Sequence, residues 1–168
     1  MAIVVTSAAS KTNTPSVLRT IIEVVAASPD ITPRSNKTLQ DLAKHGHIAV
    51  AFDGKKTVGW LIAEPLGVAA EELGMAYVLP DYRRKDILKR LIEVLEDRRK
   101  TQVFATYTPE IVTYMETVHG FEKSTLSAVT LATNGRFLTK RLSPKVITSI
   151  GGRLTKKPAH YALRKAVK

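Results

Sequence analysis

The sequence contains no cysteine, which excludes disulfides and thiolate catalysis and removes the commonest ligands of structural zinc. It also lacks long hydrophobic runs, and no stretch approaches the roughly 18 apolar residues of a membrane-spanning helix. The apolar start, residues 1–5, is too short for a signal peptide and has no basic flank. The four histidines form no metal-binding motif. We therefore expect a cytoplasmic chain with no membrane span and no metal site.

Acidic residues are missing from the last part of the chain. Residues 1–122 contain 15 Lys and Arg and 15 Asp and Glu, whereas residues 123–168 contain 11 Lys and Arg and no acid. The whole net charge of +11 thus comes from the C-terminal segment. Such asymmetry suggests an anionic partner, for example nucleic acid, a membrane surface or an acidic protein. A solvated basic surface that aids solubility explains it equally well.

The remaining sequence has the composition of one globular domain, with 44% hydrophobic residues in a chain of 168. Its clearest local signal is Asp53-Gly54 between two apolar runs, which predicts a hairpin because the turn needs a positive φ. Apolar periodicity and the positions of proline predict the other elements. Strands are expected at 2–6, 47–52, 57–63, 73–79, 103–106 and 121–131, and helices at 15–28, 38–45, 84–99 and 109–118.

Beyond Thr133 the periodicity weakens. We expect one or two helical turns over 137–142, a break at Gly151-Gly152, and a last short helix that begins at Pro158 and carries Tyr161 and Leu163. The predicted organisation is therefore a domain over residues 1–132 and a basic C-terminal extension over residues 133–168. The extension is expected to contact nucleic acid or an acidic protein.

Three motifs, in this order, resemble the GNAT family of acyl-CoA N-acyltransferases over roughly residues 1–131. They are the Asp53-Gly54 turn with Val-Gly-Trp60 after it, the stretch V-L-P-D-Y-R-R-K-D-I-L-K-R-L-I at 78–92, and Y-M-E-T-V-H-G-F at 114–121. The resemblance implies an α/β (α+β) fold with a mixed, mostly antiparallel central sheet flanked by helices. It also implies acetyl-CoA as cofactor.

The family's cofactor loop reads Arg or Gln, two residues, Gly, one residue, then Gly or Ala. Arg83 fits the first position, but Asp86 and Leu88 occupy the glycine positions. Backbone amides at a helix N-terminus bind phosphates, and glycine allows a close approach. The resemblance assigns cofactor binding to five residues: Leu79, Arg83, Arg84, Lys85 and Leu88. The lost glycines and the Asp86 charge predict weakened binding.

The resemblance also suggests catalytic groups, since acyl transfer to an amine needs a base and a proton donor for the thiolate. Glu71 and Glu72 lie just before the strand that leads into the central motif, and Glu72 is the predicted base; solvation of a loop is the alternative reading. Tyr114 is the nearest match to the family's proton donor, although it lies six residues before Gly120. Its alternative role is packing in the core.

Three functions remain open at this point. The first is transfer of an acetyl group from acetyl-CoA to an unidentified amine. The second is a non-catalytic GNAT-fold protein for assembly or binding, such as a viral or accessory protein, whose basic extension contacts nucleic acid or an acidic partner. The third is an enzyme whose extension brings it to a nucleic-acid-bound or ribosomal substrate. A homo-oligomer is compatible with each of them.

Overall fold

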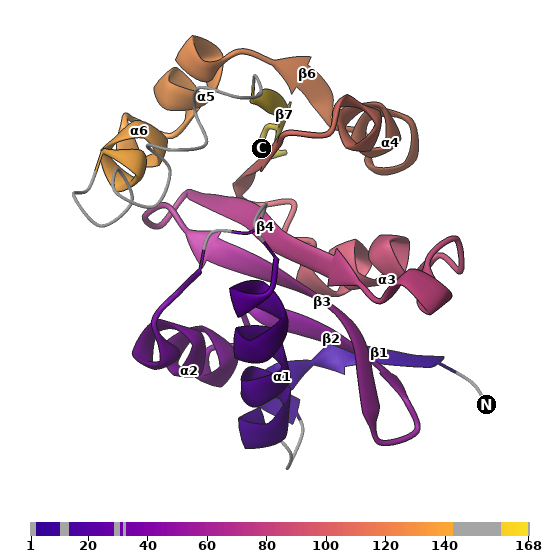
Figure 1. Cartoon of the computed structure of the whole chain (residues 1–168). Coiled ribbons are helices and arrows are strands. Elements are labelled where there is room, and N and C mark those ends of the chain that lie inside the picture. The colour runs from indigo at the N-terminus through magenta and orange to yellow at the C-terminus, as the bar shows by residue number, and fades with distance from the viewer. Residues whose placement is uncertain (1–2, 11–13, 29–30, 32, 143–158, 168) are drawn as a thin grey trace. The chain divides into compact units, whose positions relative to one another are not determined.

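The computed structural model describes residues 3–10, 14–28, 31, 33–142 and 159–167. Both helices and strands occur along the chain, and short 3-10 turns lie at Ala8–Ser10 and Pro80–Tyr82. The strands are β1 (Ile3–Ser7), β2 (Ile48–Asp53), β3 (Lys56–Pro65), β4 (Ala70–Val78), β5 (Thr101–Thr106), β6 (Glu122–Ser124) and β7 (His160–Arg164). The helices are α1 (Thr14–Ala26), α2 (Asn36–Lys44), α3 (Ile87–Leu95), α4 (Pro109–His119), α5 (Leu126–Ala132) and α6 (Arg136–Arg141) (Figure 1).

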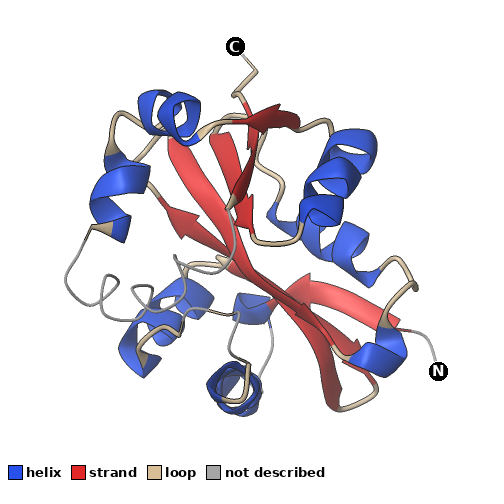
Figure 2. Cartoon of the chain, turned by 45° about the horizontal axis from the view of Figure 1, so that its top comes forward, coloured by secondary structure: helices blue, strands red, loops and turns tan. Residues whose placement is uncertain are grey.

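The strands follow the order β1-β2-β3-β4-β5-β7-β6. Neighbouring strands run antiparallel in the pairs β1–β2, β2–β3, β5–β7 and β6–β7, whereas β4 and β5 run parallel. This confirms the predicted mixed, mostly antiparallel sheet with helices (Figure 2). The chain forms two compact units, and β4 contributes to both of them. The first unit is 1–64 with 74–96, and the second is 65–73 with 97–168.

In the first unit, helices cover both faces of the strands. Alternate residues of β2 and β3, such as Val50 and Trp60, are fully buried against α1 and α2. Successive side chains of a strand point to opposite faces. Gly59 therefore faces the other side, where α3 packs on β1 and β2. The predicted hairpin is confirmed, with Gly54 at φ 58°.

The second unit has its own apolar core. Val103 of β5 and Leu163 of β7 pack there with Val129 of α5 and Phe137 of α6. The β7 strand lies between β5 and β6 and pairs with both. Residues 160–164 of the predicted extension are thus a strand of the sheet. The boundary at residue 133 itself stays a prediction.

The prediction of one strand over residues 121–131 is wrong. Strand β6 ends at Ser124, and the side chain of Thr125 accepts a hydrogen bond from the Ala128 amide at 3.2 Å. This N-cap begins α5, because it satisfies one of the amides that a helix start leaves without a partner. The apolar residues that suggested one strand are in fact shared between β6 and the buried side of the short helix α5.

The prediction of a helix carrying Tyr161 and Leu163 is also wrong, since both residues lie in β7; Pro158 is outside the described residues. The helix predicted over 84–99 is shorter, because Arg84 and Asp86 have left-handed backbones and Glu96 ends the helix in an extended conformation. The expected break at Gly151-Gly152 is outside the described residues as well.

Candidate functional site

The loop between β4 and α3 lies in the first unit and is held by hydrogen bonds to the neighbouring strands. The Leu79 amide donates to the Val58 carbonyl at 2.9 Å, and the Tyr82 amide donates to the Leu79 carbonyl at 2.9 Å. The Arg83 guanidinium folds back, so that its Nε donates to the Val78 carbonyl at 3.1 Å. The loop is therefore fixed before any ligand arrives, and Leu79 contributes to its shape.

Two residues of this loop adopt the left-handed backbone conformation that glycine usually supplies. Arg84 has φ 61° and Asp86 has φ 53°. Among residues other than glycine, Asp and Asn tolerate this region best. Position 86 therefore keeps the backbone conformation of a glycine, although it carries a side chain. Leu88 lies in the first turn of α3 with an ordinary helical backbone.

The N-terminus of α3 differs from those of α2 and α5. The side chains of Ser35 and Thr125 cap their helices by accepting a hydrogen bond from Thr38 N and Ala128 N. Asp86 makes no such bond to the first turn of α3. Because the first amides of a helix have no partner within it, this terminus can bind an anion. The exposed side chains of Arg83, Arg84 and Lys85 add three positive charges beside it.

Tyr82 joins the loop to the β2–β3 hairpin. Its hydroxyl donates to Asp53 Oδ2 at 2.9 Å, and this hydrogen bond is the main reason why the pKa of Tyr82 is raised. The ammonium groups of Lys85 and Lys56 lie 5.0 and 5.4 Å from the centre of its ring. The ring of Tyr82, whose hydroxyl stays protonated, thus holds two cations beside the loop.

The part of β4 in the first unit is irregular. Met75 has φ 50°, a conformation typical of a bulge, since it interrupts regular strand pairing. The ring of Tyr77 stacks on buried Trp60, with 5.0 Å between centroids. A Cβ atom at Gly59 would lie 3.0 Å from the Tyr77 carbonyl oxygen. Strand β3 therefore lies so close to β4 at this point that a side chain at position 59 would have little room.

Both candidate carboxylates lie in the part of β4 that belongs to the second unit, and both are buried. Glu72 pairs with two cations of α6: Arg141 Nη2 donates to its Oε1 at 2.9 Å, and Lys140 Nζ lies 3.5 Å from its Oε2. Glu71 accepts from Lys100 Nζ at 3.1 Å and from the Gln102 amide. The predicted base is therefore ion-paired, and neither carboxylate is a solvated loop residue.

Tyr114, the predicted proton donor, lies half-buried in α4 of the second unit. Its ring makes an edge contact with the His119 ring, with 5.6 Å between centroids. Arg164 of β7 donates to the His119 carbonyl at 3.0 Å, which ties the end of α4 to the sheet. The structure thus gives Tyr114 a packing contact and leaves its predicted chemical role untested.

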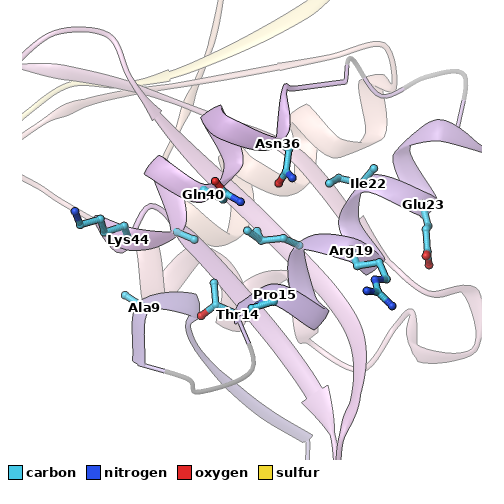
Figure 3. Close-up of a pocket in the computed structure, with 11 residues that line it drawn as sticks. Ala9, Thr14, Pro15, Arg19, Ile22, Glu23, Asn36, Gln40 and Lys44 are labelled. Carbon is cyan, nitrogen blue, oxygen red and sulfur yellow. The ribbon is translucent and has the colours of Figure 1, made fainter.

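The first unit also has a groove of about 840 Å³ between α1 and α2 (Figure 3). Its lining mixes apolar residues, such as Leu18 and Ile22, with polar and charged ones: Arg19 and Glu23 from α1 and Asn36, Gln40 and Lys44 from α2. None of the predicted site residues lines it. The groove is therefore separate from the loop that precedes α3.

The sequence did not reveal the residues that surround Glu72 in the second unit. Arg141 is 69 positions away and belongs to a helix that was expected in an extension. Tyr161 lies in β7, where burial raises its pKa and the charge of Arg141 opposes that rise. No local motif marks either residue, so only the tertiary fold could bring them to Glu72.

Among the residues that the structure describes, no group of three or more His, Asp or Glu side chains is placed to hold a metal ion. Within the same ranges, no helix has the length and apolar character needed to cross a membrane.

Comparison with models of protein families identifies one family. The sequence model of the acetyltransferase (GNAT) family matches residues 19–114, more than half of the chain. A search of curated proteins finds no significant match. The fold is similar to that of Rv2747 from Mycobacterium tuberculosis, solved in complex with CoA and NLQ, with a TM-score of 0.61, 17% identity and coverage of 98% of this chain and 99% of that one.

Two further solved structures share the fold. N-acetylglutamate synthase from Neisseria gonorrhoeae, complexed with coenzyme A and N-acetyl-glutamate, has a TM-score of 0.64 and 10% identity; the match covers all of this chain but only 36% of that one. The ribosomal-protein-S18-alanine N-acetyltransferase from Escherichia coli has a TM-score of 0.53 and 19% identity, over 74% of this chain and 80% of that one.

Proposed function

Because the chain belongs to the GNAT acetyltransferase family, we propose that it transfers an acetyl group from acetyl-CoA to a primary amine. The observation that carries this proposal is the loop before α3. This loop forms an anion site although it lacks the family's glycines. Arg84 and Asp86 have left-handed backbones, the helix start has no side-chain cap, and three cations lie beside it. The fold and the relatives crystallised with CoA support acyl-CoA binding.

The residues at this loop fit a pyrophosphate. Arg83, Arg84 and Lys85 supply positive charge, and the amides of the first turn of α3, including that of Leu88, supply hydrogen-bond donors. Arg83 uses one of its five N–H groups on Val78, so the others remain for a phosphate. Leu79 acts indirectly, since its amide already bonds to Val58 and so fixes the turn.

We assign the chemistry to the second unit. Acetyl-CoA supplies a thioester-linked acetyl group and a thiol leaving group. Glu72 would take a proton from the acceptor ammonium, since its carboxylate already holds one primary ammonium group, that of Lys140, 3.5 Å from its Oε2. Tyr114 would protonate the departing thiolate. Both roles are proposals that rest on residue type and on the resemblance.

For the acceptor, we propose the amino group of a free amino acid or of a protein N-terminus. The names of the relatives motivate this class, since they include an N-acetylglutamate synthase and an acetyltransferase of a ribosomal-protein alanine. Their identities with this chain are low, so the acceptor must be found by assay. A panel of amino acids and N-terminal peptides, with coenzyme A release as readout, is the direct test.

Binding of nucleic acid or an acidic protein by residues 133–168 is a separate proposal. Its support is the charge of that segment alone. The described cations Lys140, Arg141 and Arg164 already have partners inside the second unit. Binding of duplex DNA would weaken steeply between about 50 and 200 mM salt if many phosphates are neutralised. A salt-independent or absent interaction would remove this proposal.

Calorimetric titration with acetyl-CoA tests the cofactor site. We expect binding that is lost or strongly weakened in Arg83→Ala and Lys85→Ala, whereas Lys37→Ala, an exposed change in α2, should leave it unchanged. A ligand at about 100 times its Kd stabilises a fold by roughly 2.7 kcal/mol, so thermal unfolding gives a second readout. No binding at millimolar acetyl-CoA would refute the proposed function.

A further inference from the structure

The turn of the β2–β3 hairpin and the loop before α3 bring two lysines to one aromatic ring. Lys56 Nζ lies 5.4 Å and Lys85 Nζ lies 5.0 Å from the centre of the Tyr82 ring, so both ammonium groups make cation–π contacts with it. All three residues belong to the first unit. Each contact restrains a long, exposed side chain that would otherwise move freely in solvent. The two charges are therefore held beside the loop before a ligand binds.

The cations gathered at this ring exceed the acids near them. Residues 53–56 and 81–86 contain five Lys and Arg and three Asp. The carboxylate of Asp53 accepts the tyrosine hydroxyl on Oδ2 at 2.9 Å, and its Oδ1 is buried. In the part of the chain that the structure describes, no carboxylate forms an ion pair with Lys56 or Lys85. Two like charges beside one ring repel each other, so an anion that contacts both would stabilise the arrangement.

Coenzyme A carries a charged group that a pyrophosphate site alone does not bind. Its pyrophosphate is attached to the 5′ position of the ribose, and a further phosphate is attached to the 3′ position of the same ribose. A phosphate monoester carries about 1.5 to 2 negative charges near pH 7. When the pyrophosphate lies at the amides of α3, the shared ribose keeps the 3′-phosphate close to the loop. A protein that binds this group therefore needs cations beside the pyrophosphate site.

We infer that Lys56 and Lys85, held by Tyr82, bind the 3′-phosphate of coenzyme A and make the site selective for it; this inference rests on the proposed function. Lys85 belongs to the loop that binds the pyrophosphate, whereas Lys56 is the first residue of β3 and comes from the hairpin. An ammonium group has three donors and no fixed planar geometry, which suits a terminal phosphate. The hydrogen bond from Tyr82 to Asp53 fixes the ring between the two segments. Lys56 thus contributes selectivity without contributing to the pyrophosphate site.

Two other lysines of the first unit provide matched comparisons. Lys55 precedes Lys56 in the same turn and is exposed, but the structure places no contact between Lys55 and the described Tyr82 ring. Lys89 is exposed on α3, close to the helix start, and would bind the 3′-phosphate if that group lay over the helix instead. A general effect of positive charge would involve all of these lysines. A defined site at Tyr82 requires Lys56 and not Lys55 or Lys89.

Calorimetric titration of the full-length protein with acetyl-CoA and with acetyl-3′-dephospho-CoA tests the inference. The two ligands differ only in the 3′-phosphate, so the ratio of their Kd values measures the contribution of that group. Because hydrogen bonds to charged groups are stronger than neutral ones, we expect acetyl-CoA to bind about tenfold more tightly. If both lysines contribute equally, the ratio in Lys56→Ala should fall to about threefold, through weaker binding of acetyl-CoA alone. Lys85→Ala should weaken the binding of both ligands.

The controls separate this inference from the proposed function. Lys55→Ala and Lys89→Ala should keep the ratio of the unsubstituted protein, and Lys56→Arg should keep it as well because the cation remains. Equal affinity of the unsubstituted protein for the two ligands would overturn the inference, even though binding of acetyl-CoA would still support the proposed function. A ratio that falls as far in Lys55→Ala or Lys89→Ala as in Lys56→Ala would also overturn it. Absence of acetyl-CoA binding would instead remove the proposed function, and the inference with it.

Discussion

The substitution Gly59→Ala tests whether the packing of β3 against β4 and α3 shapes the cofactor loop. A Cβ atom at this position would lie 3.0 Å from the Tyr77 carbonyl oxygen, 3.3 Å from Val78 Cγ2 and 3.4 Å from Ile87 Cγ2. The closest of these atoms belongs to the backbone and cannot rotate away. The added methyl group must therefore push β4 and the first residue of α3 apart from β3.

Overpacking of this kind lowers the free energy of unfolding by about 1–3 kcal/mol. For a chain of this length, each kcal/mol corresponds to a change of roughly 2–4 °C in melting temperature. We therefore expect Gly59→Ala to melt about 2–12 °C below the unsubstituted protein. The loop begins and ends at the displaced elements, so the folded variant should also bind acetyl-CoA more weakly.

Gly120→Ala is the matched control for this experiment. Gly120 has φ 64°, and no atom lies within 4 Å of the position that a Cβ would occupy, so alanine there adds backbone strain of about 1–2 kcal/mol without a clash. It should reduce the melting temperature but leave acetyl-CoA affinity unchanged. If Gly59→Ala unfolds at the same temperature as the parent and binds acetyl-CoA equally well, the argument from close packing is refuted.

Three other substitutions test single groups. Tyr114→Phe should lower kcat by about 10²–10⁴-fold with little effect on acetyl-CoA affinity if Tyr114 protonates the thiolate; an unchanged kcat returns it to packing. Asp86→Asn keeps a residue that tolerates the left-handed backbone and removes the negative charge. Repulsion between two like unit charges 4 Å apart in water amounts to about 1 kcal/mol, so calorimetry should show acetyl-CoA binding up to about fivefold tighter. The control Asp41→Asn in α2 should leave this affinity unchanged. Burial raises the pKa of Tyr161, so the unfolded chain loses the phenolic proton at a lower pH than the folded chain does. The free energy of unfolding should therefore fall as the pH rises above about 10. Urea unfolding at about pH 9–11 should show a smaller loss of stability in Tyr161→Phe than in the unsubstituted protein.

In the first unit, local signals predicted the hairpin and the start of α1 correctly. Asp53-Gly54 predicted the hairpin because its turn needs a positive φ, and Gly54 has one. Pro15 lies in the first turn of α1, as expected for a residue that has no N–H to leave without a partner. These features depend on a few neighbouring residues, so the sequence alone expresses them.

The second unit depends on contacts between distant residues, and there the sequence was misread. Strand β7 obtains its hydrogen bonds from β5 and from β6, which precede it by more than 30 residues. The basic composition of the segment suggested an extension, yet Arg164 serves the fold by bonding to the His119 carbonyl and by lying 4.8 Å from the centre of the Phe121 ring. Charge counts cannot distinguish such cations from those that face solvent.

In the loop before α3, the sequence gives a misleading prediction of the backbone conformation at the glycine positions. A glycine provides both a left-handed backbone and the absence of a side chain, and the substitution of Asp86 and Leu88 suggested that both were lost. In the structure, Asp86 has φ 53° and Leu88 is helical, so residue 86 keeps the left-handed conformation without glycine. What the substitutions change is therefore charge and bulk around the amides.

The Asp86 charge is exposed to solvent and can be screened by salt. Affinity for acetyl-CoA should accordingly respond more to removal of the Asp86 charge than to replacement of its backbone by glycine, and comparison of Asp86→Asn with Asp86→Gly measures the two contributions separately.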